Sequence, residues 1–425
     1  MLLDRAEEGP TLVIAPTSVG FNWLRETQRF APSLRPLLYR ESDRKEMLSD
    51  LKNGDIVISS YALALRDGSE LAKIKWGTLV MDEAQAIKNG RSKTNQSIGE
   101  LNAKWSIALT GTPMENHLGE LWSLFNVVSP GVFGGWESFR SRFATPIEKH
   151  NDPVARENLA HRIQPFILRR TKENVLKELP SRTEVVQYVD LSPEERVQYE
   201  AVRRSAIGEI QNLAVLPDIK DQRFKILALL TRLRQFACHP GIVNKNWERS
   251  SAKLDQLCSI LENLKDEGHR ALVFSQFTEH LALIRDALTQ RGISFQYLDG
   301  STPATERQKR VDAFQNGNDV AFLISLKAGG TGLNLTAADY VIHMDPWWNP
   351  AVEDQATDRA HRMGQQKPVM VYRIVARGTI EEEILALHET KRDLVDGILD
   401  GTDAAGKLST KDLMNIIIKT NDTPS

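Results

Sequence analysis

Short, continuous apolar runs alternate with amphipathic stretches in two separate parts of this chain, and this alternation restricts the fold more than any other feature. In the first part the apolar runs cover residues 11–15, 55–59, 78–81 and 106–109. Runs of this length without polar alternation are typical of strands that are buried on both faces. The stretches between them, such as 21–30 and 45–51, have helical spacing. The order predicts a parallel α/β sheet.

The same pattern returns near residue 270 and predicts a second sheet. Its expected strands are 271–274, 294–298, 320–324, 340–344 and 369–375, and its expected helices are 279–291, 306–315, 352–361 and 380–399. Two mostly helical blocks, 118–179 and 193–239, separate the sheets. In the second block one apolar helix face is expected from residues interpreted as recurring at three- and four-residue spacing: Phe224, Leu227, Leu230, Leu233 and Phe236. The predicted fold class is therefore α/β, with two parallel-sheet lobes and helical insertions.

Composition limits the class of protein without selecting a function. The 425 residues are enough for about two or three domains. The 54 basic and 56 acidic residues give a net charge of −2, which neither indicates nor excludes nucleic-acid binding through a local patch. Cys238 and Cys258 are too few for a disulfide framework or a four-ligand zinc site, and no long apolar run or signal peptide is present. A cytoplasmic location is expected.

Two adjacent carboxylates follow the apolar run at 78–81, in the tetrapeptide Asp82-Glu83-Ala84-Gln85. Ligands of parallel sheets bind at the carboxyl ends of the strands. There Asp82 could hold Mg²⁺, directly or through water, and Glu83 could polarise an attacking water. The alternative is an acid pair that begins a helix and is favoured by the helix dipole.

The next apolar run ends in a turn of small and hydroxyl residues, Thr110-Gly111-Thr112-Pro113. Such a turn could link a nucleotide site to a neighbouring moving part, with glycine permitting the tight bend. By itself the turn is unremarkable. The hypothesis depends on the order in the chain, where an acid pair at one strand end precedes this turn at the next.

A glycine-rich segment, 325–335 (SLKAGGTGLNL), lies between a strand and a helix of the second sheet. Its backbone N–H groups could bind a phosphate of DNA or of a nucleotide, although an ordinary βα turn also uses glycine. Further on, Arg359 and Arg362 are three residues apart and are expected on one face of the helix 352–361. Two guanidiniums so placed could neutralise a γ-phosphate. The alternative is surface pairing with Glu353, Asp354 or Asp358.

The loop Asp345-Pro346-Trp347-Trp348-Asn349-Pro350 holds two adjacent tryptophans. They could lie along DNA or pack between lobes, and core packing is the alternative for at least one of them.

In this order the segments resemble the Swi/Snf family of superfamily-two, DEAD/DEAH-box-related helicase-like ATPases, over residues 11–399. The box at Asp82 is similar to Walker B, Thr110-Gly111-Thr112-Pro113 to motif III, 329–334 to motif V and 355–365 to motif VI with its arginine fingers. Three further segments are similar to Swi/Snf hallmarks: 168–172 (LRRTK), 233–240 (LRQFACHP) and the Trp-Trp-Asn-Pro run. The compact insertions resemble those of prokaryotic members.

The resemblance assigns further residues to two roles. Nucleotide contacts are expected from Gln85, Thr110, Gly111, Thr112, Gly330, Gly332 and Gln355. DNA contacts are expected from Pro16, Thr17, Ser18, Trp23, Ser60, Tyr61, Ser275, Gln276, Ser325, Lys327, Thr331, Asn334, Trp347 and Trp348.

What the resemblance implies is ATP- and Mg²⁺-dependent translocation along double-stranded DNA by two RecA-like lobes. A nucleoid-associated remodeller of a DNA-bound protein complex is expected. The implied divisions are lobe one at 1–179, with a helical insertion from about 118, a linker and helical insertion at 180–250, lobe two at 251–400 and a tail at 401–425. The alternatives are a non-catalytic DNA- or protein-binding remnant and an RNA helicase.

One motif of the family is not found in the sequence. The family's phosphate-binding loop, ending in Gly-Lys-Thr, is expected just before Thr11, where only ten residues stand. A decoy, 401–407 (GTDAAGK), is followed by Leu408 instead of a Ser or Thr that binds Mg²⁺, and it does not follow a buried strand. Because the strand before the loop is central in the family's sheet, a poorly stable lobe one is also expected.

We expect the 425-residue polypeptide alone to have no substantial ATPase activity, because the amides and lysine that hold the β- and γ-phosphates are not in it. The measurement is phosphate release by the purified chain with and without duplex DNA. Turnover like that of an intact family member would contradict the expectation.

Overall fold

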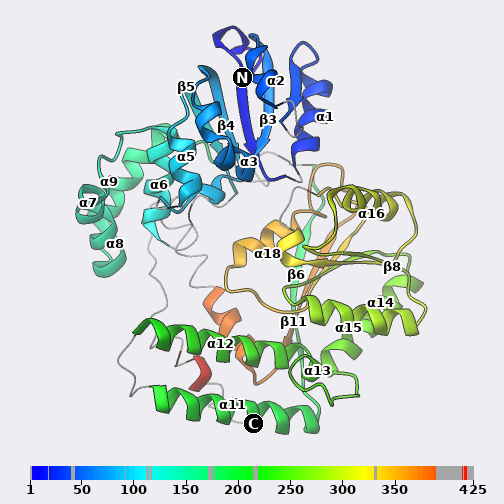
Figure 1. Cartoon of the computed structure of the whole chain (residues 1–425). Coiled ribbons are helices and arrows are strands. Elements are labelled where there is room, and N and C mark those ends of the chain that lie inside the picture. Colours follow the sequence, from blue (N-terminus) through cyan, green and yellow to red (C-terminus); the bar gives the residue numbers. More distant parts are fainter. Residues whose placement is uncertain are drawn as a thin grey trace. The chain divides into compact units, whose positions relative to one another are not determined.

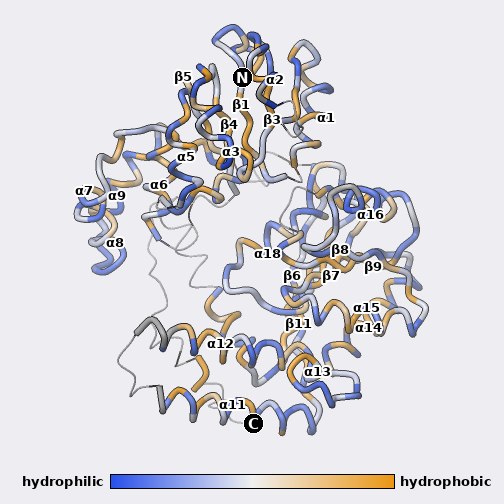
Figure 2. Tube along the Cα trace, viewed as in Figure 1, coloured by the Kyte–Doolittle hydropathy of each residue, from blue (hydrophilic) through white to orange (hydrophobic). Residues whose placement is uncertain are grey.

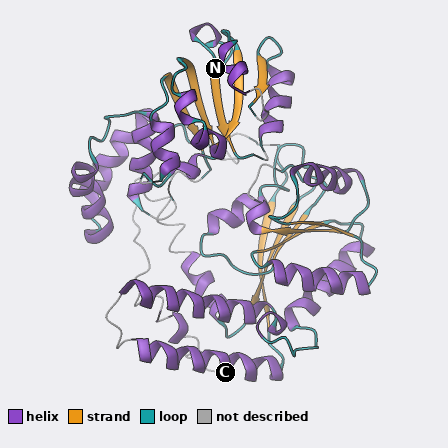
Figure 3. Cartoon of the chain, in the orientation of Figure 1, coloured by secondary structure: helices purple, strands orange, loops and turns teal. Residues whose placement is uncertain are grey.

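The computed structural model describes residues 2–17, 19–39, 44–90, 92–111, 114, 117–170, 176, 178–213, 219–329, 333–388, 414 and 416–418. The chain divides into two compact units. Of the described residues, lobe one comprises those up to 167 and lobe two comprises those from 168 onward. Each lobe contains one parallel β-sheet with helices packed on it, so the predicted fold class is confirmed (Figure 3).

Lobe one is built on a five-stranded sheet of order β2-β3-β1-β4-β5, with every neighbouring pair parallel (Figure 1). Its strands are β1 (Thr11–Ala15), β2 (Arg35–Leu38), β3 (Asp55–Ser60), β4 (Trp76–Asp82) and β5 (Ala103–Leu109). The helices among them are α1 (Gly20–Phe30), α2 (Arg44–Ser49), α3 (Tyr61–Arg66), α4 (Gly68–Leu71) and α5 (Lys93–Gly99). The four predicted strands are confirmed. The pattern analysis did not predict β2, whose Pro36 is typical of edge strands.

Alternate residues of the central strands enter two separate cores, as a strand period of two requires. Leu12 and Ile14 of β1 pack with side chains of α3, α4, α5 and α6 (Leu118–Val128). Val13 and Ala15 pack on the other face, with Trp23 and Leu24 of α1. Every residue of β1 is buried, which explains its uninterrupted apolar sequence (Figure 2).

The two edges of this sheet differ in character. β2 is short and carries the exposed Arg35 and the ring of Pro36, whereas β5 is seven residues long and includes Trp105 and Ile107. The side chains of β5 are half-buried or exposed, in contrast to the buried strands β1 and β3. An apolar strand therefore lies at one edge of the sheet.

A helical subdomain follows β5 and has its own core. It contains α6, α7 (Trp136–Phe139), α8 (Thr145–His150) and α9 (Pro153–Ile163). Aromatic rings dominate this core, with Phe133 placed 4.8 Å from Phe125 and 5.0 Å from Phe139 between ring centroids. The predicted helical insertion from about residue 118 thus forms a compact block within lobe one.

Lobe two contains a six-stranded parallel sheet of order β6-β11-β10-β7-β9-β8. Its strands are β6 (Arg182–Val189), β7 (Ala271–Ser275), β8 (Phe295–Leu298), β9 (Ala321–Ser325), β10 (Tyr340–His343) and β11 (Val369–Ala376). Its helices are α11 (Pro193–Leu213), α12 (Ile219–Cys238), α13 (Pro240–Val243), α14 (Ala252–Asp266), α15 (Thr278–Gln290), α16 (Ala304–Asn316), α17 (Leu326–Gly329) and α18 (Pro350–Thr357). The five predicted strands are confirmed. β6 lies within the segment expected to be linker and helix, and it pairs along its whole length with β11.

The two faces of the second sheet are also covered separately. Val273 of β7 and Leu323 of β9 pack against α14 and α15 on one face. Phe274 and Phe322 face the other side, where Phe314 of α16 lies 5.1 Å from Phe322 between ring centroids. The carboxyl ends of these strands are therefore held on a rigid support.

The expected apolar face of α12 is partly wrong. Leu230, Leu233 and Phe236 are buried, but Phe224 is 76% exposed and Leu227 is 39% exposed. In a helix with 3.6 residues per turn, side chains three residues apart are about 60° short of a full turn from each other. A series at strict three-residue spacing therefore winds around the helix and does not stay on one face. The buried set adds residues at the four-residue spacing: Ile226, Leu229, Leu230, Leu233, Phe236 and Ala237.

The expected helix 352–361 is also wrong in extent. α18 begins at Pro350 after the cap residue Asn349, whose side chain accepts a hydrogen bond from the backbone N–H of Ala351, and it ends at Thr357. The following residues form turns. Of the expected helix 380–399, residues 380–388 are helical and the remainder lies outside the described residues. In the described part of the chain, no helix is long and apolar enough to cross a membrane.

A buried ion pair ties α18 to β11. The guanidinium of Arg373 donates from Nε to Oε2 of Glu353 over 2.9 Å, and Glu353 is fully buried. Arg373 also contacts Glu184 of β6. Burial raises the pKa of the Glu353 carboxyl, and the neighbouring Arg373 opposes that rise.

We expect Arg373→Met to lower the free energy of unfolding of lobe two by about 3–5 kcal/mol, because it leaves the buried Glu353 carboxylate without its cation. The matched control is Arg285→Met, because Arg285 pairs with Asp286 at the surface. Its expected cost is at most about 1 kcal/mol. Urea unfolding followed by circular dichroism measures both, and equal losses in the two variants would contradict the prediction.

Candidate nucleotide and DNA sites

The parallel register of lobe one brings the predicted site segments to one edge of the sheet. Ala15, the last residue of β1, pairs with Ser60, and Asp82 at the end of β4 pairs with Leu109 at the end of β5. The segments beginning at Pro16, Tyr61, Glu83 and Thr110 therefore all leave the sheet at its carboxyl edge. This edge is where open parallel sheets bind ligands.

Asp82 is the most heavily bonded of these residues. Its Oδ2 accepts a hydrogen bond from the indole Nε1 of Trp23 over 2.8 Å, and its Oδ1 accepts one from the backbone N–H of Glu83 over 3.0 Å. The hydroxyl of Tyr61 donates to the backbone carbonyl of Asp82 over 2.8 Å. Three segments of lobe one thus fix the position of this carboxylate.

A chain of hydrogen bonds continues from the acid pair to the next strand. Glu83 has a left-handed backbone (φ 50°), a strained conformation for a residue with a β-carbon. Its Oε2 accepts from Nε2 of Gln85 over 2.8 Å, and Oε1 of Gln85 accepts from the hydroxyl of Thr110 over 2.9 Å. The acid box and the Thr-Gly-Thr-Pro turn are therefore joined through Gln85, as the order of the two motifs suggested.

The expected DNA contacts of lobe one separate into two groups. Trp23, Ser60 and Tyr61 use their polar atoms within the lobe: the hydroxyl of Ser60 caps α3 by accepting from the N–H of Leu63, and Tyr61 bonds to Asp82. Burial raises the pKa of the Tyr61 hydroxyl, and the charges of Asp82 and Glu83 raise it further. Pro16 is half-buried and Thr17 is exposed. Among the described members of this set in lobe one, Thr17 is thus the exposed one.

The donor set at the end of β4 fits a magnesium ion. Each oxygen of the Asp82 carboxylate has two acceptor positions, and one hydrogen bond to each is observed. Carboxylate oxygen is a ligand that Mg²⁺ prefers, and the remaining acceptor positions can take the ion or its bound water. Asp82 is therefore the residue that would hold Mg²⁺ in lobe one.

In lobe two the structure brings the arginine segment next to the glycine-rich segment. The backbone carbonyl of Arg359 accepts from the N–H of Leu335 over 3.0 Å, and Nη1 of Arg362 donates to the carbonyl of Leu333 over 3.3 Å. Arg359 is buried and Arg362 is half-buried. Because α18 ends at Thr357, the two arginines lie in the turns after the helix and do not share a helix face. Gln355 precedes them on α18 and is half-buried.

The expected DNA contacts of lobe two also differ in exposure. Ser275 and Ser325 are buried, and their hydroxyls bond to Asp345 and to the N–H of Ala328. Gln276 is half-buried, and its backbone N–H donates to Asp345. Among the described members of the set, Lys327 and Asn334 are exposed.

The two tryptophans after β10 have a packing role that the sequence analysis named as the alternative. Trp347 packs with the core beneath α16 and Trp348 with the core of α11 and α12, and both are half-buried. The guanidinium of Arg234, on α12, lies over both rings at 5.5 and 5.2 Å from their centroids. Sequence analysis did not select Arg234, although its place in the segment 233–240 was a signal.

Five expected site residues lie outside the described residues: Ser18, Thr112, Gly330, Thr331 and Gly332. Gly111 is described and exposed.

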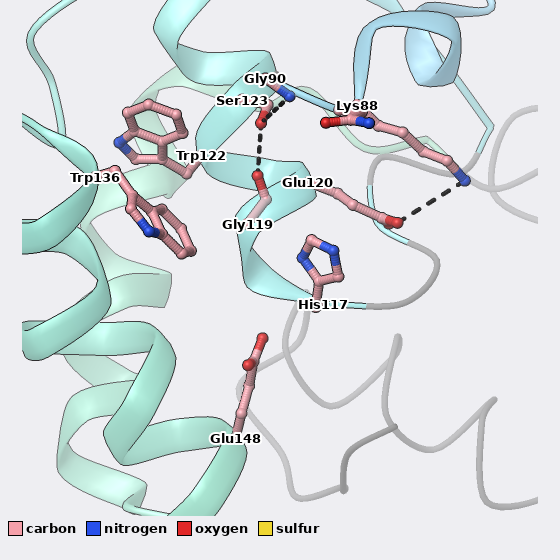
Figure 4. A pocket seen from close by; sticks show the side chains of 10 residues that line it. Lys88, Gly90, His117, Gly119, Glu120, Trp122, Ser123, Trp136 and Glu148 are labelled. Carbon is pink, nitrogen blue, oxygen red and sulfur yellow. Dashed lines mark hydrogen bonds and ion pairs between the residues drawn. The ribbon is translucent and has the colours of Figure 1, made fainter. Parts of the chain in front are cut away.

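A cavity of about 700 Å³ lies in lobe one, but none of the expected site residues lines it (Figure 4). The rings of Trp122 and Trp136 form one wall, with their centroids 5.5 Å apart. Lys88 and Glu120, whose charged atoms are 3.9 Å apart, form the opposite wall. The cavity adjoins the N-terminal end of α6, where Glu148 accepts a hydrogen bond from the N–H of Leu118. We assign it no part in nucleotide chemistry.

Comparison with known proteins identifies the class and then the family. A helicase conserved C-terminal domain matches residues 252–364, and a SNF2-related domain matches residues 2–242. The second match covers more than half of the chain, so the chain belongs to the SNF2-related, Swi/Snf-type family of ATP-dependent helicases and ATPases.

The relatives are distant and longer than this chain. YwqA of Bacillus subtilis (strain 168), to which an ATP-dependent helicase or translocase activity is ascribed, is 39% identical over 96% of this chain and 45% of its own length. The mouse SWI/SNF-related matrix-associated actin-dependent regulator of chromatin subfamily A member 1 is 36% identical over 90% of this chain and 38% of its own. This chain therefore spans less than half the length of either protein. The SWI2/SNF2 ATPase core of Sulfolobus solfataricus in complex with double-stranded DNA is 36% identical, covers 97% of this chain and 87% of its own, and gives a TM-score of 0.45.

We expect Trp23→Phe to lower the free energy of unfolding of lobe one by about 1.5–3 kcal/mol beyond its loss of packing, because the bonded partner of the indole is a carboxylate. The matched control is Trp122→Phe, whose indole donates to the neutral carbonyl of Gly134 over 3.1 Å. Its hydrogen bond accounts for about 0.5–1.5 kcal/mol. Urea unfolding measures both variants. A larger loss of unfolding free energy in Trp122→Phe than in Trp23→Phe would show that the hydrogen bond to Asp82 stabilises lobe one no more than a bond to a neutral carbonyl does.

Proposed function

We propose that this chain is the motor part of an ATPase that double-stranded DNA stimulates and that moves along the DNA. The observation that carries the proposal is the hydrogen-bonded series Asp82, Glu83, Gln85 and Thr110 at the carboxyl edge of lobe one. Membership of a family of ATP-dependent helicases supports it. ATP and Mg²⁺ are the proposed substrate and cofactor.

The geometry gives each residue of the series a distinct task. Magnesium bound at Asp82 would neutralise charge on the phosphates of ATP. Glu83 is half-buried, and one of its oxygens is held by Gln85, so the carboxylate is oriented to accept a proton from the attacking water. Thr110 bonds to the same Gln85, so a shift of the Thr110 turn would be transmitted to Glu83.

Lobe two contributes positive charge to the same reaction in this proposal. Arg359 and Arg362 would stabilise the negative charge that develops on the transferred phosphoryl group. Their bonds to Leu333 and Leu335 connect them to the glycine-rich segment, which is the proposed phosphate contact. Movement of one segment therefore moves the other.

The proposed DNA contacts are best supported for the exposed members of the predicted set: Thr17, Lys327 and Asn334. Phosphate contacts from such side chains and from backbone amides supply sequence-independent affinity. We propose that Trp23, Tyr61 and Ser275, whose polar atoms are used internally, position the adjoining loops. A DNA-bound protein complex is the proposed remodelling target. For the 425 residues alone we propose DNA binding without ATP turnover, because no Gly-Lys-Ser or Gly-Lys-Thr loop occurs in this sequence.

We expect Glu83→Gln to lower DNA-stimulated ATP turnover at least about 100-fold, because it removes the proposed proton acceptor and keeps the size of the side chain. The enzyme for this test is the chain joined to an upstream segment that supplies the phosphate-binding loop. DNA affinity should be unchanged, as judged by fluorescence anisotropy of a labelled duplex. The matched control is Glu46→Gln, an exposed acid of α2 in the same lobe.

Three outcomes would contradict the proposal. Full turnover in Glu83→Gln would remove Glu83 from the chemistry. Stimulation by duplex RNA and not by duplex DNA would favour an RNA helicase. Salt-dependent DNA binding with no turnover in the chain that carries the loop would favour a non-catalytic binding protein.

A further inference from the structure

Three metal-ligating side chains from distant parts of the sequence meet in the interior of lobe two. They are Cys238 at the end of α12, His280 on α15 and Asp345 after β10. The thiol sulfur, a ring nitrogen and a carboxylate oxygen all lie within 4.8 Å of one another, and all three residues are buried. Cys238 lies in the segment 233–240 and Asp345 begins the loop of the two tryptophans, but the proposed ATPase chemistry does not use this cluster.

His280 supplies an independent observation. It is fully buried, and neither of its ring nitrogens has a hydrogen-bond partner among the described residues. A neutral imidazole has one N–H and one lone pair, and leaving both unmatched in an apolar interior is costly. Buried groups of this kind are uncommon and often mark an ion or water that satisfies them.

We propose that Cys238, His280 and Asp345 form a buried site for a divalent transition-metal ion, with zinc as the ion of best fit. A thiolate, an imidazole and a carboxylate are the three ligand types of zinc sites in proteins. Zinc bonds of about 2.0–2.3 Å place tetrahedral donor atoms about 3.3–3.6 Å apart. The three donors therefore need to close by at most about 1.5 Å, which side-chain rotation provides.

The charge balance of the surroundings is compatible with the ion. A divalent cation bound by the Cys238 thiolate and the Asp345 carboxylate is electrically neutral as a group. Lys253 is already paired with Glu381 over 2.8 Å. Arg234 lies 4.0 Å from Asp345 and also donates to the carbonyl of Pro346 over 2.7 Å.

Other contacts hold two of the ligands in place. Asp345 accepts hydrogen bonds from the hydroxyl of Ser275 and the backbone N–H of Gln276. The thiol of Cys238 donates a hydrogen bond to Oε1 of Glu381 over 3.9 Å, and this proton leaves when the thiolate binds the ion. An ion at this site would join α12, α15 and the loop after β10, and this loop leads directly into Trp347 and Trp348. Three side chains leave the fourth tetrahedral position of the ion to a water.

The test uses the untagged 425-residue chain, kept reduced with a phosphine and freed of metal by a chelator. We expect Co²⁺ to bind with a stoichiometry of one and to give the near-ultraviolet absorption of a thiolate–cobalt bond, and Zn²⁺ to displace it. Cys238→Ala should abolish this absorption. The matched control, Cys258→Ala, should keep it, because Cys258 is the other buried thiol and lies outside the cluster.

A second measurement covers the case in which Cys238→Ala does not fold. His280→Leu removes the unmatched ring nitrogens and keeps the site apolar, and we expect it to fold and to lose at least 100-fold in Co²⁺ affinity. Zinc should raise the thermal midpoint of the wild-type chain and of Cys258→Ala, but not of His280→Leu. The proposal fails if the wild-type chain shows no thiolate–cobalt absorption. It also fails if Cys258→Ala abolishes this absorption, or if His280→Leu binds Co²⁺ as tightly as the wild-type chain does.

Discussion

Parallel pairing of β4 with β1 on one side and β5 on the other fixes the position of the acid pair at the end of β4. Because all strands of this sheet run the same way, the segments after β1, β3, β4 and β5 emerge at one edge. The buried, alternating packing of the strands resists a one-residue slip, since such a slip would exchange the two faces. The rigid sheet thereby holds the short polar loops in register and so fixes the position of the acid pair, Asp82 and Glu83.

Asp82 is the acceptor on which several of these loops converge. Trp23 and Tyr61 reach it from the segments after β1 and β3, which the family resemblance associates with DNA. These contacts give a physical route by which the position of those segments bears on the acid pair. The route consists of individual hydrogen bonds, and each bond can be removed by a substitution that takes away its donor group. In lobe two the corresponding link is between the arginine turn and the residues after the glycine-rich segment.

The sequence was informative wherever burial decided the structure. Nine strands were predicted from continuous apolar runs, most of which are buried on both faces, as in β1 and β9, whereas β5 and β8 are largely half-buried. β2 and β6 were missed because their exposed side chains give no continuous apolar run. The order of Asp82 and Thr110 indicated a shared site, but their link through Gln85 depends on the left-handed turn at Glu83, which has no signal in a sequence. The end of α18 was misjudged because the turn holding Arg359 is fixed by bonds to residues far along the chain.

The unequal edges of the first sheet have a consequence for how this protein behaves in solution. At one edge, the ring of Pro36 removes a backbone donor and Arg35 adds charge, both of which discourage another strand from adding. At the other, β5 is longer and offers Trp105 and Ile107 with only Lys104 as a charged residue. That edge is a template for a parallel strand, whether from another segment of the same polypeptide or from a second molecule. A strand paired with β5 would make β5 an interior strand. An unpaired β5 favours association between protein molecules, which increases with protein concentration.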